Sequence, residues 1–346
     1  MKFHDSEINT VIPTKVVGPI KIKYMELTED ISVPLATFEI PLWSSAHRGA
    51  IVSQKSGGIS VCVIDDIMTR SIILDADNLD EILACKKWIE SNEEKISNTV
   101  TSTSNYAELR RIHIENVGRL LYIRLSMHTG NASGHNMATK AADAVAEIII
   151  RNCRNIKYVS VSGNYCTDKK NSSINGILGR GKRVSAEIIV PRSACEFVLK
   201  TTPEEIVSLN VKKNFVGSML AGGVRSANAH YANVVLAMYL ATGQDGANVV
   251  EASQGITYAE MNGTDLYFSI NIPNLIVGTV GNGKHLDFAK KNLELMGCHG
   301  DDPLSSSRLS AIIASTVLCS ELSLMASLTK RGDLVHSHMI LERYQK

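Results

Sequence analysis

Between residues 69 and 161, the spacing of the hydrophobic residues changes in a regular order between that of strands and that of helices. This pattern restricts the fold more than any other feature of the sequence. Four stretches alternate apolar and polar residues, as strands with one buried face do: 69–74, 110–115, 119–127 and 157–161. Residues 79–95, with Asn78 as the expected N-cap, and residues 135–152 predict helices. The resulting order, β-α-β-β-α-β, is the split βαβ pattern of a ferredoxin-like sandwich.

The sequence on both sides of this segment has a different character. Further strands are predicted at 59–64, 184–190 and 265–272, and further helices at 286–296 and 308–330. Residues 217–242, rich in alanine and glycine, predict one long, closely packed helix. We therefore predict an α+β protein in which a large mixed domain, residues 1–68 and 164–346, holds an inserted ferredoxin-like domain at residues 69–163.

Composition excludes several classes of function. The formal net charge of +1 argues against a nucleic-acid-binding protein, which usually carries a basic excess. Seven cysteines without a Cys-x-x-Cys pair, and histidines without His-Glu-x-x-His, predict reduced thiols in the cytoplasm and no metal site. The N-terminus has no apolar segment typical of a signal peptide. The apolar run at 311–328 is interrupted by Glu321 and predicts a buried helix, not a membrane span.

Common phosphate-binding motifs do not fit the sequence. Gly176 and Gly181-Lys182 have P-loop spacing, but Arg183 stands where a Ser or Thr would hold Mg²⁺. No Gly-x-Gly-x-x-Gly follows a strand, so a Rossmann fingerprint is absent. A strand expected at 276–280 leads into the glycine-rich run Gly278–Gly283, and such a run forms a turn as often as a phosphate cradle.

Two polar features suggest acid–base or electrostatic chemistry. In the loop at residues 162–170, Lys169 and Lys170 follow Asp168, an arrangement suited to holding a developing negative charge beside a carboxylate. Adjacent lysines on a loop are also typical of a solvated surface. Glu39 lies between apolar residues, which favour a protonated carboxyl, although a strand-end glutamate facing water fits the same pattern.

The nonapeptide Ser162–Lys170, followed by Gly179-Arg180-Gly181-Lys182, resembles the cis-loop of the hydroxymethylglutaryl-CoA (HMG-CoA) reductase family. The resemblance extends from residue 9 to residue 343, in the family's order. It includes these further segments: Lys213–Ser218, Asn228–His230, Ala241–Asp245, Gly278–Gly281, Glu321–Leu324 and Ser337–Met339. It favours the class I, sterol-type reductases, without the membrane anchor of animal and fungal relatives.

In that family a thioester is reduced twice, to an aldehyde and then to an alcohol, with two NAD(P)H consumed. The resemblance implies that Lys169 stabilises the carbonyl oxygen and that Glu39 donates a proton. It implies that Asp245 hydrogen-bonds both residues and that His338 protonates the departing CoA thiolate. Without the resemblance, Asp245 fits a turn after a helix, and His338 fits a surface tail in which His336 is an equal candidate.

The matching positions also predict binding residues. For the substrate, a CoA thioester, they are Arg70, Ser162, Asn164, Lys170, Lys213 and Asn233, with Ser45 and Arg48 at the CoA end. For the cofactor, NADPH, they are Asn131, Gly134, Asn136, Ser104, Asn105, Gly278 and Gly281. The segment Asn131–Met137 resembles the family's Asp-Ala-Met-Gly-Met-Asn motif. It begins a predicted helix, where free backbone N–H groups favour a phosphate.

One departure bears on the choice of cofactor. Asn105 stands where NADPH-dependent relatives carry an arginine for the 2′-phosphate, so the charge-assisted contact is lost and NADH should be accepted comparatively well. Arg110 and Arg111 could compensate. The family's active site lies between two subunits, which implies a homodimer or homotetramer acting on small molecules. Two alternatives remain: a non-catalytic CoA-ester-binding relative, and an NAD-dependent enzyme that degrades mevalonate.

Overall fold

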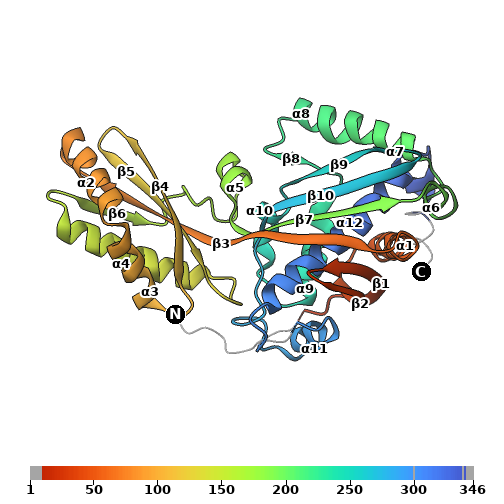
Figure 1. Ribbon diagram of the computed structural model, residues 1–346, viewed down its shortest axis with the longest axis horizontal. Helices are drawn as coiled ribbons and strands as arrows, with labels where there is room; N and C mark the ends of the chain where they lie inside the picture. Colours follow the sequence, from red (N-terminus) through yellow and green to blue (C-terminus); the bar gives the residue numbers. More distant parts are fainter. Residues whose placement is uncertain (1–9, 299–300, 337–338, 340–346) are drawn as a thin grey trace.

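The computed structural model describes residues 10–298, 301–336 and 339, and shows two lobes joined by one long strand, β3 (Ile59–Asp75) (Figure 1). β3 pairs with β7 as far as Ile67 and with β5 from Met68 onward, so it belongs to both sheets. The two strands predicted at 59–64 and 69–74 are therefore one. The residues between them continue the ladder with β7 and β5, and Ile67 and Met68 are buried, so no turn interrupts the strand. The predicted domain boundary falls inside β3, and the domain assignment stays a prediction.

The smaller lobe has the predicted ferredoxin-like fold. Its sheet has the order β4-β5-β3-β6, with antiparallel pairs throughout. Its remaining elements are β4 (Glu108–Val117), β5 (Leu120–His128), β6 (Lys157–Val161), α2 (Leu79–Ser91), α3 (Glu93–Thr103) and α4 (His135–Asn152). The helix predicted at 79–95 is thus two helices. Asn92 separates them, and its side chain donates to the carbonyl oxygen of Trp88 at 2.8 Å.

Helix α4 packs a narrow stripe of small and branched residues against the sheet. Its buried residues recur at intervals of three and four: Ala138, Ala141, Ala142, Val145, Ala146 and Ile149. This period places them on one helical face, and the alanines allow a close approach to β3 and β5. Together with apolar residues of α2 and α3 they form a hydrophobic core separate from that of the larger lobe.

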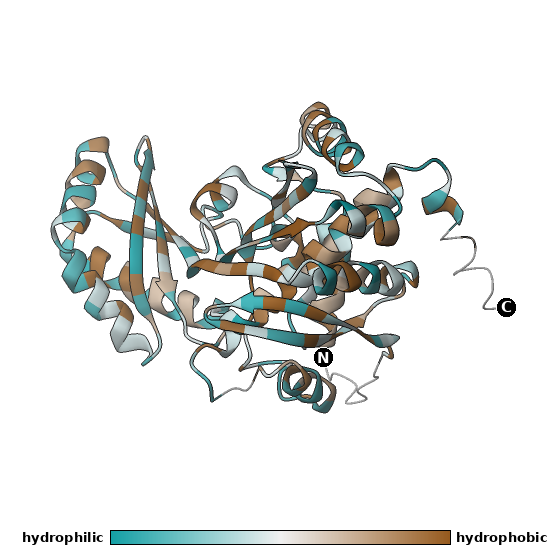
Figure 2. Ribbon diagram, turned by 45° about the vertical axis from the view of Figure 1, so that its right-hand side comes forward, coloured by the Kyte–Doolittle hydropathy of each residue, from teal (hydrophilic) through white to brown (hydrophobic). Residues whose placement is uncertain are grey.

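The larger lobe is built on a sheet of order β2-β1-β3-β7-β10-β9-β8. Its strands are β1 (Thr14–Tyr24), β2 (Leu27–Ala36), β7 (Gly181–Val190), β8 (Ser226–Ala227), β9 (Gly255–Asn262) and β10 (Asp265–Leu275). Figure 2 shows hydrophobic and hydrophilic residues alternating along several of them. β10 takes in the strand predicted at 265–272 and ends before residues 276–280, which are not a strand.

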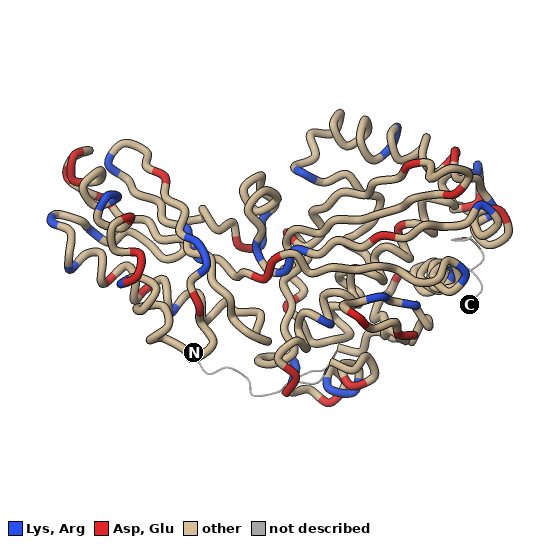
Figure 3. Tube along the Cα trace, in the orientation of Figure 1, with Lys and Arg blue, Asp and Glu red and all other residues tan. Residues whose placement is uncertain are grey.

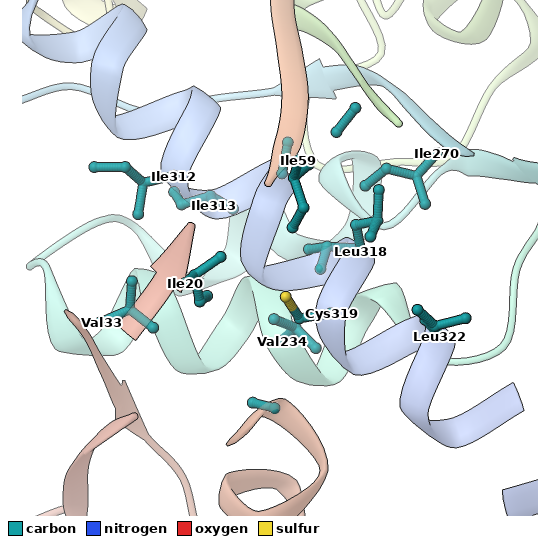
Figure 4. Packing of buried hydrophobic residues seen from close by; sticks show 14 of the residues in the cluster. Ile20, Val33, Ile59, Val234, Ile270, Ile312, Ile313, Leu318, Cys319 and Leu322 are labelled. Carbon is teal, nitrogen blue, oxygen red and sulfur yellow. The ribbon is translucent and has the colours of Figure 1, made fainter. Parts of the chain in front are cut away.

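Helix α12 (Ser305–Leu328) forms the centre of this lobe. It is long and apolar enough to cross a membrane, but 94% of its most apolar window is buried inside the protein. Figure 4 shows its side chains packed among residues of β1, β2, β3 and α9 (Tyr231–Ala241). Helix α1 (Pro41–Lys55) crosses α12 at Gly49, where an added Cβ would lie 2.1 Å from the carbonyl oxygen of Cys319.

The long helix predicted at 217–242 is wrong. Only α9 is helical over a long stretch, and the chain before it turns at 221–224 and pairs β8 with β9. Arg225 has a left-handed backbone with φ 49°, which a continuous helix excludes. Asn228 accepts a hydrogen bond from the N–H of Tyr231, the first residue of α9. Tertiary contacts thus outweigh the helix propensity of the alanines.

The remaining elements are short and connect these layers. They are α5 (Ser173–Leu178), α6 (Arg192–Ala194), η1 (Cys195–Leu199), α7 (Pro203–Leu209), η2 (Asn210–Gly217), α8 (Ser218–Leu220), η3 (Gly246–Asn248), α10 (Val249–Ala252) and α11 (Asp287–Leu295). Charged residues of both signs lie along the chain where β3 passes between the lobes (Figure 3), and there Lys182 pairs with Asp66 at 2.8 Å. The loops that carry Lys169 and Asp245, two of the predicted catalytic residues, meet beside this crossing.

Candidate active site

The loop between β6 and α5 has an unusual backbone. Asn164, Thr167 and Lys169 all adopt positive φ angles, of 55°, 42° and 55°. Left-handed backbone is uncommon for non-glycine residues, and it is least favourable for a β-branched residue such as Thr167. Such conformations persist only where surrounding contacts hold them, and they gather at functional sites.

A buried ion network holds this loop. The guanidinium of Arg180, whose side chain is fully buried, lies 2.9 Å from Asp168 Oδ1 and 3.1 Å from Glu251 Oε1. The same Oε1 of Glu251 accepts a hydrogen bond from the backbone N–H of Lys169 at 3.0 Å. Burial raises the pKa of Glu251, and the charge of Arg180 opposes this. The network fixes the backbone on both sides of the Asp168–Lys169 peptide bond.

The side chain of Lys169 pairs with Asp245. Lys169 Nζ lies 2.7 Å from Asp245 Oδ2, and both side chains are close to half exposed. The hydrogen bond to Asp245 raises the pKa of Lys169. Partial burial raises the pKa of Asp245, but the hydrogen bonds from Lys169 and the Ala247 N–H outweigh it, so the pKa is lowered overall. Both partners are therefore charged at neutral pH, which the predicted role of Lys169 requires.

This pair lines a cavity of about 510 Å³ between the two lobes. The cavity wall consists of Arg70, Ala132, Ser133, Gly134, His135, Asn136, Met137, Asp168, Lys169, Asp245, Val280, Gly281, Asn282 and Lys284. Helix α4 begins in this wall. Gly134, at its N-cap, has φ 84°, and an added Cβ would meet Thr129 Oγ1 at 2.5 Å. The first N–H groups of α4 thus approach the cavity without a side chain at the cap, as an anionic cofactor group requires.

His135, the first residue of α4, adds a neutral imidazole to the same wall. Its Nε2 lies 3.7 Å from Asp168 Oδ1 and is buried without a hydrogen-bond partner. Burial and the positive charge of Arg180 lower the pKa of His135 to about 4, although Asp168 acts in the opposite direction. The imidazole is therefore uncharged at neutral pH.

Glu39 lies in a second cavity, of about 330 Å³. Ser45, Arg48 and Asn233 line it too, and the Nδ2 of Asn233 donates to Glu39 Oε2 at 2.7 Å. Arg48 already donates to the hydroxyls of Ser323 and Ser327 on α12. None of the described residues lines both cavities. The predicted hydrogen bond between Asp245 and Glu39 is absent within the described part of the chain, because the two carboxylates belong to different cavities.

The other predicted substrate residues divide into groups. Arg70 lines the larger cavity and lies 3.6 Å from Asp168. Ser162, Asn164 and Lys170 share the Lys169 loop but line neither cavity; Ser162 Oγ contacts Cys166 Sγ at 3.2 Å, and Lys170 Nζ donates to the Asp168 carbonyl. Lys213 lies apart on η2. His338 is outside the described residues.

The predicted cofactor residues also divide. Gly134, Asn136 and Gly281 line the larger cavity. The side chain of Asn131 links the lobes: Nδ2 donates to the Asp302 carbonyl at 2.6 Å, and Oδ1 accepts from the Ser306 N–H at 3.0 Å. The Gly278 N–H donates to Gln244 Oε1. Ser104 and Asn105 lie at the end of α3, away from the cavity wall.

Several functional candidates escaped sequence reasoning. Asp168 and His135 lie inside motifs that were recognised, and their polar side chains could have marked them as functional candidates. Lys284 follows the glycine-rich run directly. Arg180 also stood in a recognised run, Gly179–Lys182, whereas Glu251 carried no such signal, because 71 residues of sequence separate it from Arg180. Within the part of the chain that the structure describes, no cluster of three His, Cys, Asp or Glu residues is placed to hold a metal ion.

Comparison with known proteins gives a consistent result. The sequence model of hydroxymethylglutaryl-coenzyme A reductase matches residues 9–343. The 3-hydroxy-3-methylglutaryl-coenzyme A reductase of Aeropyrum pernix is 41% identical over 336 residues, covering 96% of this chain and 79% of that protein. The reductase of Pyrococcus horikoshii is 40% identical over 337 residues, covering 96% and 81%.

A solved structure shares the fold. The class II 3-hydroxy-3-methylglutaryl-CoA reductase of Streptococcus pneumoniae, bound to NADPH in open conformations, superposes with a TM-score of 0.75 at 17% identity. The match covers 95% of this chain and 88% of that one. The family match and the two sequence relatives span nearly the whole chain. The chain belongs to the hydroxymethylglutaryl-coenzyme A reductase family.

Proposed function

We propose that this protein reduces HMG-CoA to mevalonate and CoA in the cytoplasm, with two NADPH consumed. The observation that carries the proposal is the Lys169–Asp245 ion pair, which faces the N-terminus of α4 across one cavity. A charged lysine and an anion-binding helix terminus in one cavity suit hydride transfer to a carbonyl, because the phosphates of the dinucleotide and the developing oxyanion both need positive charge nearby. The nicotinamide dinucleotide supplies the hydride when bound.

Lys169 has the central electrostatic role. As hydride reaches the thioester carbon, the carbonyl oxygen gains negative charge, and the Lys169 ammonium stabilises it. Asp245 keeps that ammonium protonated, since the hydrogen bond between them raises the pKa of Lys169. Glu251 and Arg180 hold the lysine backbone in place. Loss of the CoA thiolate then leaves an aldehyde, which a second hydride reduces to the alcohol with the oxyanion again at Lys169.

Glu39 supplies the proton for the alcohol in this proposal, although it lies in the other cavity. A homodimer in which the Glu39 cavity of one subunit faces the Lys169 cavity of its partner brings the two together. Ser45 and Arg48, beside Glu39, then hold the CoA end, while Arg70, Ser162, Asn164, Lys170 and Lys213 serve the carboxylate end. Protonation of the thiolate falls to His338.

NADPH is the proposed cofactor, with NADH accepted as well. Asn105 is exposed and uncharged. The two arginines that could compensate have acidic partners: Arg110 lies 3.0 Å from Glu108, and Arg111 pairs with Asp65. A 2′-phosphate would compete with these carboxylates for the two arginines, so the 2′-phosphate adds little to the affinity for NADPH. Because the uncharged Asn105 is also compatible with NAD, NAD-dependent oxidation of mevalonate is the second candidate function.

The test is cofactor oxidation by the purified protein with HMG-CoA, in parallel with NADPH and NADH. Replacing Lys169 by Ala should lower kcat about a hundredfold or more, the scale for loss of one oxyanion donor. Lys170→Ala is the matched control and should retain a much larger share of kcat. A folded wild-type protein that turns over neither cofactor would exclude the reductase and favour a CoA-ester-binding protein.

The same assay addresses the two questions about the cofactor. An NADPH preference of about a hundredfold in kcat/KM would contradict the proposed acceptance of NADH, and Asn105→Arg should shift the preference toward NADPH. Mevalonate oxidation with NAD and CoA that exceeds HMG-CoA reduction under matched conditions would favour the degradative direction.

A further inference from the structure

Lys284 is a buried cation that the proposed mechanism does not use. It follows the glycine-rich run at 278–283 and lines the same cavity as Lys169 and Asp245. The residue is only 8% exposed. Its Nζ donates to the carbonyl oxygen of Asn282, two residues away, at 3.2 Å. Among the residues that the structure describes, no carboxylate lies within ion-pair distance of this ammonium group.

Such a placement is unfavourable without a ligand. A buried ammonium group loses hydration, and a single backbone carbonyl replaces little of it. Burial accordingly lowers the pKa of Lys284, and the more distant charge of Asp245 opposes this only in part. An anion bound in the cavity would supply the missing charged partner and would raise the pKa of Lys284 again.

The opposite part of the wall points to the same kind of ligand. Helix α4 has 18 residues, and it begins at the cavity with Gly134 as its cap and with His135, Asn136 and Met137 in its first turn. The unpaired N–H groups and the dipole of a helix N-terminus attract anions, above all phosphate. A buried lysine with no carboxylate partner among the described residues and a helix N-terminus thus converge on one cavity.

We propose that Lys284 binds the diphosphate of the nicotinamide dinucleotide, beside the N-terminus of α4 at which the family motif already places the cofactor. The assignment rests on the proposed reductase function, and names a residue that holds the cofactor for it. The diphosphate fits better than the other anions of the reaction. The position expected for the 2′-phosphate, at Asn105, lies outside the cavity wall, and the expected CoA contacts at Ser45 and Arg48 line the other cavity. The nicotinamide must approach Lys169, and the diphosphate lies one ribose away.

The test compares Lys284→Met and Lys284→Arg with Lys290→Met, which removes an exposed lysine from α11. Binding of NADPH and NADH is measured directly by the fluorescence of the reduced nicotinamide, and KM and kcat by cofactor oxidation. NADH and NADPH share the diphosphate, so Lys284→Met should weaken binding of both by the same factor, about tenfold to a hundredfold. The KM for HMG-CoA should be unchanged, and Lys284→Arg should restore part of the affinity.

A second readout separates ligand binding from a structural role. Removal of a buried charge that has no carboxylate partner among the described residues should raise the melting temperature of the ligand-free protein, whereas removal of a structural lysine would lower it. Weaker binding of NADPH alone would assign Lys284 to the 2′-phosphate, and a higher KM for HMG-CoA alone would assign it to the substrate. Either result, or unchanged affinity for both dinucleotides, would overturn the proposal. The fluorescence measurement of cofactor binding does not depend on turnover, so this test is separate from that of the reductase proposal. The reductase proposal fails only if the wild type shows no turnover.

Discussion

At the scale of single residues, His135 makes the stability of the folded protein depend on pH. The pKa of this imidazole is near 6.5 in the unfolded chain. In the folded protein it is lowered to about 4, because burial and the charge of Arg180 disfavour protonation. The unfolded state therefore binds more protons inside this window. The contribution of His135 to stability is complete above pH 6.5 and is lost as the pH falls toward 4, by about 2–3 kcal/mol. Urea unfolding at pH 7 and pH 4.5 measures it.

The matched variant for this prediction is His135→Met, which keeps a side chain of similar length without the titrating group. Its free energy of unfolding should fall less between the two pH values than that of the wild type. Equal losses in both proteins would show that His135 titrates normally. In the wild type, the NMR shifts of the imidazole should report a midpoint near pH 4.

Arg180 illustrates what a fully buried charge contributes. Arg180→Leu leaves Glu251 without its cation and Asp168 with only the more distant Arg70, and breaking a buried pair costs about 3–5 kcal/mol of stability. Arg192→Leu removes a partly exposed partner of Glu196 and Glu204 and should cost under about 1 kcal/mol. Chemical denaturation of both variants gives the comparison. Similar losses would contradict the structural role of the buried network.

At the scale of elements, the crossing of α1 and α12 depends on one missing Cβ. Gly49→Ala would place a carbon 2.1 Å from the Cys319 carbonyl oxygen, so the helices must move apart, with an expected loss above about 3 kcal/mol. Gly217→Ala is the control, since its nearest neighbouring atom is 3.6 Å away and its backbone is helical. That change should be neutral or stabilise by about 0.5 kcal/mol. Thermal unfolding distinguishes the two substitutions.

At the scale of the whole molecule, the separation of Glu39 from Lys169 predicts complementation between subunits. Glu39→Gln and Lys169→Ala should each be nearly inactive. In a mixed dimer, one of the two sites recovers both intact residues, so random exchange of equal amounts should restore about a quarter of wild-type activity. Co-refolding of the two variants, followed by cofactor oxidation, measures this. Activity no higher than that of either variant alone would place each complete site within a single subunit.

The sequence alone determined the elements whose patterns are local. The four strands of the inserted sheet, helix α4 at 135–152 and the buried character of α12 follow from hydrophobic period and length. The family and the residues Lys169 and Asp245 followed from a long motif. Only the tertiary structure decided that β3 is continuous, that the stretch 217–242 breaks before α9, and that Glu39 occupies a separate cavity. The pairing of Arg180 with Glu251 and the burial of Lys284 belong to the same group. These depend on contacts between distant segments, whose geometry a local pattern does not encode.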